Sequence, residues 1–310
     1  MYVQLPLLFN MSGRVREFCG ICERPDMTRL VKEDLFQIDK KLARYDLLFK
    51  KQTGKTIIQT AKAAAEFTGS GEGKKCAVIP VTAGLGIITD FSETVAGILK
   101  YAGADAFVTK AADVSGLKEA YEKGCELAFL ADDDTFLACS LKSGVFADNG
   151  KATGYGFAQA LLFAIESRRG SAKGQRILVL GAGPVGRAAA HYIAGKGAIA
   201  VIYDIDRKKQ EKLLLRESGA VAAADGGSCE NCLYIIDATT QGNFIDAGQV
   251  CEDTLIAAPG MPPGPTRQAM EKAVVIHNPL ELGTLTMYFM CLKEAQDNYT
   301  PRVGAGAFKP

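Results

Sequence analysis

The sequence predicts an α/β protein that has a C-terminal Rossmann dinucleotide-binding domain and an N-terminal α/β domain with leading helices. Two observations lead to this prediction. Short apolar segments alternate with helical patterns over most of the 310 residues, which is typical of parallel βαβ units. One of these segments runs into the motif G-x-G-x-x-G at 181–186, and a helix-like stretch follows the motif.

The first half of the chain begins with two helical patterns. Apolar residues spaced three and four apart predict a helix over 28–50 and a second over 56–67. Short apolar runs then predict three strands, over 76–82, 105–110 and 127–132. Helices are expected between them, from about 90 to 102 and around 116–123. Asp90 and Glu93 have the spacing of a capping box at the start of the first of these helices.

A helix over 153–168 connects this half to a second alternating series. Apolar segments that each end in a turn predict five strands, over 176–183, 199–206, 233–239, 254–260 and 273–279. Helical patterns lie over 184–195, 207–218 and 281–294. We therefore place a domain boundary near residue 150.

Composition excludes several classes of function. The chain has 36 Lys and Arg against 35 Asp and Glu, and this balance predicts no electrostatic attraction to nucleic acid or to an anionic membrane. No apolar run approaches the roughly 18 residues that span a bilayer. The two histidines exclude a three-His zinc site.

The nine cysteines, without a recognisable signal peptide, indicate reduced thiols and a cytoplasmic protein. Two CxxC pairs, Cys19 with Cys22 and Cys229 with Cys232, have the spacing of a four-thiolate zinc site. About 200 residues separate the pairs, so the favoured interpretation is isolated thiols and no bound metal.

The glycine motif indicates a dinucleotide site. Gly181 permits a tight turn, Gly183 lets backbone approach a pyrophosphate, and Gly186 allows close helix packing. Asp204 ends the next strand, where a carboxylate accepts from ribose hydroxyls and disfavours a 2′-phosphate, so NAD is the expected cofactor. Arg207 and Lys208 keep NADP open as the alternative. The residues expected to bind the cofactor here are Gly181, Ala182, Gly183, Pro184, Val185, Gly186, Asp204, Ile205 and Arg207.

The ends of the later strands extend this expected cofactor site, because open α/β sheets bind ligands at the carboxyl edge. The candidates are Thr239, Thr240, Pro259, Gly260, Asn278 and Pro279, and the alternative is that they are ordinary turn residues. His277 precedes Asn278, and a structural histidine is favoured there over a proton carrier.

Several motifs outside the glycine loop resemble one enzyme family. They are PVTAGLGIITDFSETVAGI (80–98), DVSG (113–116), ADDDTFLA (131–138), FADN (146–149), PGMP (260–263) and NPLELGT (278–284). Together with the glycine motif, they are similar to the pyrrolysine synthase family, the dehydrogenases that complete pyrrolysine biosynthesis. The resemblance runs from about Met27 to about Cys291.

The resemblance implies an NAD-dependent oxidoreductase that acts on a CH–NH2 group. Its expected substrate is L-lysine-Nε-3-methyl-D-ornithine, whose terminal amine is oxidised to an imine. Water then releases ammonia, and the resulting aldehyde condenses with the neighbouring amine, with loss of water, to give L-pyrrolysine. Family analogy also suggests a homodimer. The alternative is another two-domain NAD(P)-dependent dehydrogenase, of the amino-acid, shikimate or methylene-tetrahydrofolate type.

The resemblance also places a substrate site in the first domain. Asp132 is the expected catalytic residue and a substrate contact, although Asp132 to Asp134 could instead form a helix N-cap or a weak Mg²⁺ site. The other expected substrate contacts are Leu30, Thr82, Ala83, Leu85, Ile87, Ser92, Asn149 and Glu281. Ala83 stands where a serine is usual in the family and Leu85 where a polar residue is usual. Asn149 has the alternative of a plain turn asparagine, and Leu30 that of a core residue.

The family start aligns with Met27. The expected organisation is therefore an N-terminal extension over 1–26, a substrate domain over 27–150, the Rossmann domain over 151–296 and a flexible tail over 297–310.

Overall fold

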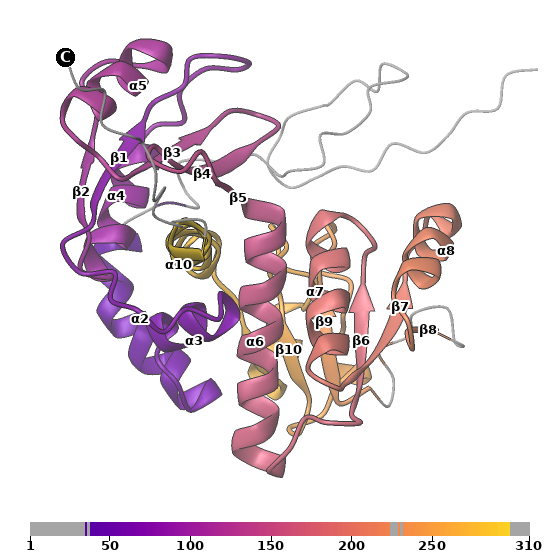
Figure 1. The fold of residues 1–310 in the computed structure, drawn as a ribbon. Coiled ribbons are helices and arrows are strands. Elements are labelled where there is room, and N and C mark those ends of the chain that lie inside the picture. Colours follow the sequence, from indigo (N-terminus) through magenta and orange to yellow (C-terminus); the bar gives the residue numbers. More distant parts are fainter. Residues whose placement is uncertain (1–34, 36–37, 224–228, 230–231, 298–310) are drawn as a thin grey trace, which may run out of the picture.

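A computed structural model of the protein describes residues 35, 38–223, 229 and 232–297 (Figure 1). Leu30, the expected extension over 1–26, the tail beyond 297, and both Cys19 and Cys22 lie outside the described residues. In the described part, every helix is too short or too polar to cross a bilayer. The structure is built around two β-sheets, which confirms the predicted α/β fold class.

The first sheet has the strand order β2-β1-β3-β4-β5. Its strands are β1 (Lys75–Ile79), β2 (Asp105–Val108), β3 (Leu127–Ala131), β4 (Phe136–Ser140) and β5 (Phe146–Asp148). The first three strands are parallel, and β4 and β5 add to β3 in antiparallel fashion. Along β1, Cys76 and Val78 face the main core, whereas Ala77 and Ile79 face a smaller cluster that includes Ala120 of α5 (Asp113–Glu122). This alternation is the period of a strand that is buried on both faces.

Two helices follow the parallel strands, α4 (Phe91–Tyr101) and α5 (Asp113–Glu122). The predicted capping box at the start of α4 is wrong. Asp90 has a φ of +66°, in the left-handed region, and makes no side-chain cap hydrogen bond, whereas a capping residue normally has an extended backbone. The sequence predicts neither β4 nor β5, because the acidic run 132–134, which forms the turn between β3 and β4, has the composition of a ligand cluster.

The second sheet is fully parallel and has the order β11-β10-β9-β6-β7-β8. Its strands are β6 (Arg176–Leu180), β7 (Ile199–Tyr203), β8 (Val221–Ala222), β9 (Tyr234–Asp237), β10 (Leu255–Ala257) and β11 (Val274–Ile276). This is the strand order of a Rossmann fold, in which the direction of winding reverses between β6 and β9. The accompanying helices are α7 (Pro184–Gly195), α8 (Arg207–Arg216), the 3₁₀ turn Ala247–Gln249 and α9 (Arg267–Lys272).

One long helix, α6 (Asn149–Arg169), runs between the two sheets (Figure 1). Two of its glycines bring other helices close. A Cβ at Gly154 would lie 2.5 Å from the carbonyl oxygen of Val185 on α7, and a Cβ at Gly156 would lie 2.7 Å from Oγ1 of Thr286 on α10 (Glu281–Asp297). Because neither position has room for a side chain, α6 seats directly against both neighbours.

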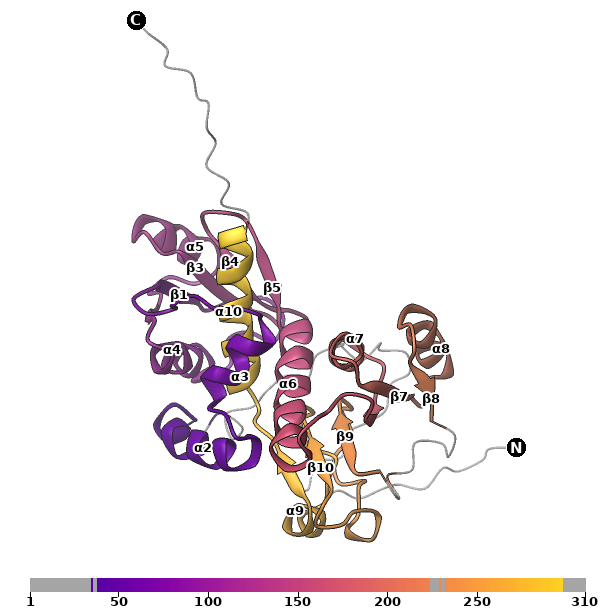
Figure 2. The same cartoon turned by 60° about the horizontal axis from the view of Figure 1, so that its bottom comes forward.

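The last helix, α10 (Glu281–Asp297), returns from the second sheet to the first. It packs against α6, against α3 (Ile57–Ala64) and α4, and against β4 and β5. Figure 2 shows α3 and α10 on the first-sheet side of α6. The predicted domain boundaries remain predictions, but the packing of α10 joins the end of the chain to the first sheet.

Helix α2 (Ile38–Thr53) connects both halves of the molecule. Its Asp46 is only 8% exposed and accepts hydrogen bonds from the backbone N–H of Ile57 at 2.6 Å and from the Tyr101 hydroxyl at 2.8 Å. Toward the second sheet, the Gln52 amide donates to the carbonyl oxygen of Val275 on β11 at 3.0 Å. The side chain of Asp46 therefore fixes α2 to α3 and α4, while Gln52 fixes it to β11.

We expect Asp46→Ala to lower the free energy of unfolding by about 3 kcal/mol, because it leaves a buried N–H and a hydroxyl without their acceptor. Leu47→Ala is the control on the same helix: Leu47 is 72% exposed, so we expect a change within about 0.5 kcal/mol. Urea unfolding of both variants measures the difference. Equal stabilities would show that Asp46 contributes nothing to the position of α2.

Candidate active site

The glycine loop lies at the carboxyl end of β6, where the winding of the second sheet reverses. Gly181 has a φ of +93°, and a Cβ there would lie 2.7 Å from the carbonyl oxygen of Ala238. A Cβ at Gly186 would collide with the carbonyl oxygen of Gly181. By contrast, apart from Gly183 itself and its two chain neighbours, no atom lies within 4 Å of the Cβ position of Gly183, the N-cap residue of α7. The loop is therefore closed toward the protein and open in front of the helix N-terminus, which is the shape that a pyrophosphate requires.

Asp204 lies beside this loop, immediately after β7. Its Oδ2 accepts from the backbone N–H of Ala182 at 2.6 Å, and its Oδ1 accepts from that of Asp206 at 2.7 Å. Ile205 is 87% exposed next to it, and Arg207 is also exposed at the start of α8. The two bonds fix the carboxylate at the edge of the glycine loop, where the fingerprint expects an acceptor for ribose hydroxyls.

The loops after β9 and β10 form the other side of this crevice. Thr239 and Pro259 are half-buried there, and Thr240 is exposed. A Cβ at Gly260 would collide with the carbonyl oxygen of Thr239, so the two loops are in direct contact. Beneath them lies Asp237, which is 0% exposed and which the sequence analysis missed. A lone carboxylate at the end of an apolar strand was the signal that could have found it.

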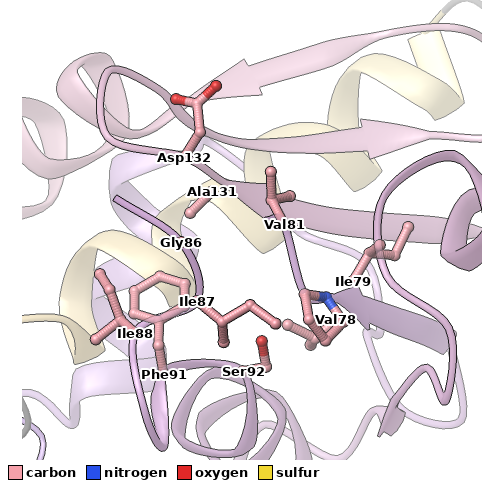
Figure 3. Close-up of a pocket in the computed structure, with 11 residues that line it drawn as sticks. Val78, Ile79, Val81, Gly86, Ile87, Ile88, Phe91, Ser92, Ala131 and Asp132 are labelled. Carbon is pink, nitrogen blue, oxygen red and sulfur yellow. The ribbon is translucent and has the colours of Figure 1, made fainter. Parts of the chain in front are cut away.

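A pocket opens at the carboxyl edge of the first sheet (Figure 3). This shallow opening is continuous with solvent and lies between the ends of β1 and β3, the segment 86–88 and the start of α4. Three of the expected substrate residues line it, namely Ile87, Ser92 and Asp132. Most of the remaining lining is apolar, including Val81, Ile88 and Phe91.

Asp132 also builds the turn between β3 and β4. Its Oδ1 accepts from the backbone N–H groups of Asp134 at 2.9 Å and Thr135 at 2.8 Å. Figure 3 shows its carboxylate on the opposite side of the opening from Phe91 and Ser92, pointing away from them. Oδ1 of Asp132 therefore stabilises the turn, while the residue also lies at the rim of the pocket.

Thr82, Ala83 and Leu85 are exposed and do not line this pocket. Two carboxylates hold their segment in place. Asp113 accepts from the backbone N–H of Thr82 at 2.8 Å and from its hydroxyl at 2.6 Å, which lowers the pKa of Asp113. Asp133 accepts from the backbone N–H of Leu85 at 2.6 Å. The side chain of Leu85 remains 80% exposed.

Asn149 and Glu281 lie at the first turns of α6 and α10, which are adjacent. A Cβ at Gly283 on α10 would lie 3.1 Å from Oδ1 of Asn149, and a Cβ at Gly150 would lie 3.0 Å from the ring of Pro184. The expected substrate contact Asn149 is thereby close to the start of α7. The glycine loop and the first turns of α6 and α10 thus belong to one region of the molecule.

Glu281 is 5% exposed, and burial raises its pKa, although its carboxylate accepts from the backbone N–H of Leu280 at 3.1 Å. No motif in the sequence indicates Tyr45, a half-buried residue of α2 whose pKa is raised by burial of its hydroxyl and by the nearby Glu281. The Asn278 amide donates to the Tyr45 hydroxyl at 3.0 Å, and its oxygen accepts from the backbone N–H of Leu282. Asn278 therefore fixes the end of β11 to α2 and α10.

Sequence comparison identifies the family. Residues 32–147 match the sequence model "Pyrrolysine biosynthesis protein PylD, N-terminal domain". The chain is 33% identical over 269 residues to the pyrrolysine synthase of Methanosarcina acetivorans, covering 86% of this chain and 100% of that protein. It is 34% identical over 270 residues to the pyrrolysine synthase of Methanosarcina barkeri, covering 86% and 98%. The chain belongs to the pyrrolysine synthase family. This confirms the family that the motifs predicted.

Solved structures resemble the chain more distantly. Shikimate dehydrogenase from Aquifex aeolicus gives a TM-score of 0.45 at 16% identity and covers 72% of this chain and 92% of its own. Quinate dehydrogenase from Corynebacterium glutamicum, in complex with NAD, gives 0.43 at 12% identity and covers 74% and 99%. At these values the likeness says nothing about the reaction of this family member.

Metal ligands do not gather in the described part of the chain: no three His, Cys, Asp or Glu side chains there are placed to hold an ion. Of the two CxxC pairs, only Cys229 and Cys232 belong to this part.

We expect Asp133→Ala to accelerate hydrogen exchange at the Leu85 amide by about tenfold or more, because this amide loses its carboxylate acceptor. Mass spectrometry of peptides over 81–90 measures the effect. Asp134→Ala removes an exposed neighbouring carboxylate and serves as the control, for which the rate should stay unchanged. Equal rates in both variants would show that Asp133 does not hold the segment.

Proposed function

We propose that this chain is an NAD-dependent dehydrogenase that completes pyrrolysine biosynthesis. Its substrate would be L-lysine-Nε-3-methyl-D-ornithine, and the products would be L-pyrrolysine, ammonia and NADH. The observation that carries the proposal is the similarity to two pyrrolysine synthases over essentially their whole length. The open glycine loop, with Asp204 fixed beside it, supports a dinucleotide cofactor.

The N-terminus of α7 and Asp204 would hold the cofactor. Pro184 has no N–H, so the N–H groups of Val185 and Gly186 in the first turn of α7 would bind the pyrophosphate, while the Asp204 carboxylate suits the adenosine ribose. A carboxylate at this place repels a 2′-phosphate, which supports NAD over NADP. When bound, the nicotinamide supplies the acceptor for the hydride.

The chain's own residues would bind the substrate amine and accept the proton that it loses. The terminal amine has to lose a proton before its carbon can give up a hydride. Glu281 is suited to hold such a proton, because burial raises its pKa above that of an exposed glutamate. Asp132 would bind a cationic group of the substrate at the rim of the pocket. Asn149 would form a hydrogen bond with another polar group of the substrate.

The remaining steps exchange C–N and C–O bonds and need no further oxidation. Hydride loss leaves an imine, and water adds to it and releases ammonia. The aldehyde so formed condenses with the neighbouring amine and loses water, which closes the ring. The largely apolar lining of the pocket, with Ile87 and Phe91, would receive the aliphatic part of the substrate. We further propose that the enzyme is a cytoplasmic homodimer, as the family analogy suggests.

Incubation of the purified protein with NAD⁺ and the synthetic substrate tests the reaction. We expect NADH absorbance to appear together with a product that has the mass of pyrrolysine. Dinucleotide binding without turnover of this amine would overturn the proposed substrate, and a screen of amino acids, shikimate and methylene-tetrahydrofolate would then test the other dehydrogenase types.

We expect Asp204→Ala to weaken NAD binding by about tenfold and to reduce the preference for NAD over NADP, because the ribose loses its acceptor and a 2′-phosphate loses its repulsion. Calorimetric titration with both cofactors measures this. Glu211→Ala, an exposed change on α8, is the control and should bind both as the unchanged protein does. Unaltered NAD affinity in Asp204→Ala would show that the ribose lies elsewhere.

We expect Asp132→Asn to lower turnover by about a hundredfold with NAD affinity unchanged, because the charge that binds the ammonium is lost. Asparagine retains an oxygen for the N–H groups of Asp134 and Thr135, so the turn is preserved. Steady-state kinetics of Asp132→Asn beside Asp134→Asn separates the two roles. Full activity in both variants would limit Asp132 to its structural task.

A further inference from the structure

Asp237 joins two loops that the proposed cofactor site uses. It is the last residue of β9 and is 0% exposed. Its Oδ2 accepts from the backbone N–H of Gly264 at 2.7 Å, in the loop after β10. Its Oδ1 accepts from the hydroxyl of Thr239 at 2.8 Å and from the backbone N–H of Thr239 at 3.2 Å, in the loop after β9. One buried carboxylate therefore bonds to both loops.

The two loops are also paired with each other. The backbone N–H of Asn243 donates to the carbonyl oxygen of Pro263 at 3.1 Å, and that of Phe244 donates to the carbonyl oxygen of Gly264 at 2.7 Å. A Cβ at Gly242 would lie 2.6 Å from Cγ of Pro262. Because they contact along their length, the loops form one layer, and a shift of either would move the other.

This layer lies across the glycine loop from Asp204. β7 and β9 flank β6 on opposite sides, and Asp204 follows β7 whereas Asp237 ends β9. A dinucleotide that crosses the β6–β9 reversal with its adenosine ribose at Asp204 has its nicotinamide half on the β9–β10 side. The paired loops, with Thr239, Thr240, Pro259 and Gly260, are the surface on that side.

Asp237 cannot touch a ligand itself, because no part of it is exposed. Opposing effects act on the pKa of Asp237. Burial raises it and has the largest effect, while the Thr239 and Gly264 donors and the charge of His277 lower it. His277 lies beyond β10, where its Nδ1 is 2.7 Å from the carbonyl oxygen of Ala258. A fully buried carboxylate is costly unless it is hydrogen-bonded, and the hydrogen bonds that Asp237 accepts come from the two loops.

We propose that Asp237 is a positioning residue that holds the loops after β9 and β10 in the shape that receives the nicotinamide half of the dinucleotide. The inference rests on the proposed NAD-dependent function. The inference concerns only the nicotinamide half of the cofactor. A general role of Asp237 in stability would affect the binding of both halves, so the two roles can be distinguished.

The test compares the affinities of NADH and ADP-ribose, which lacks the nicotinamide. In Asp237→Asn the side-chain size is kept, but whichever way the amide is turned, its NH2 group faces an N–H of Gly264 or of Thr239. We expect the Kd of NADH to rise about tenfold and the Kd of ADP-ribose to stay within about twofold of its original value. Asp253→Asn is the control: this exposed aspartate precedes β10 at the opposite edge of the sheet, and both affinities should be unchanged.

Gly264→Ala provides a second variant that keeps the carboxylate, and it decides the matter if Asp237→Asn does not fold. Its Cβ would lie 2.5 Å from Oδ2 of Asp237, so the loop has to move. We expect the same selective loss of NADH affinity. Equal losses for both ligands, or no loss for either, would overturn the positioning role while leaving the cofactor proposal intact. An unchanged protein that binds NADH no more tightly than ADP-ribose would overturn the proposed cofactor placement and the positioning role with it.

Discussion

The seating of α6 against α7 and α10 is the contact on which the geometry of the whole site depends. Gly154 and Gly156 lie two residues apart, and each faces a different helix at a distance that no side chain would allow. On one side, α6 holds the helix that begins at the glycine loop; on the other, it holds the helix that begins at Glu281. The separation between the dinucleotide crevice and the first-sheet region is therefore set by backbone contact, which is stiffer than contact between long side chains.

Carboxylates that accept hydrogen bonds from backbone N–H groups hold the loops near these helices in place. Asp133 holds the segment at Leu85, Asp113 holds Thr82, Asp204 holds Ala182 and Asp237 holds Gly264. Each acceptor comes from a different part of the chain than the loop that it holds. Loops at the carboxyl edge of parallel strands have few apolar contacts of their own, so side-chain acceptors replace packing as the means of ordering them. The half-buried Asp113 and the fully buried Asp237 show opposite shifts of pKa, because hydrogen bonds dominate at the first and desolvation at the second.

Local features of the chain could be predicted from the sequence, and features made by distant residues could not. The glycine motif and its strand are adjacent in sequence, so their structure follows from the residues themselves. Tyr45 meets Asn278 across 233 positions, and Asp237 meets Gly264 across 27, with no local pattern that indicates either contact. The capping box at Asp90 fails for a related reason: the residue adopts a left-handed backbone conformation, and spacing alone does not specify that conformation.

Ala83 and Leu85, which the resemblance suggests differ from the usual family residues, lie in a segment that carboxylates from elsewhere in the chain hold in place. Asp133 accepts from the backbone N–H of Leu85, and Asp113 accepts from Thr82, so neither anchor uses the side chain of Ala83 or of Leu85. A backbone anchor tolerates any side chain that can adopt the same conformation, whereas the glycine at 84 is required, since a Cβ there would collide with Asp133. The path of the segment is thus encoded by Gly84 and by carboxylates on other elements. Residues 83 and 85 remain free to change the chemistry of the surface beside the pocket without moving it.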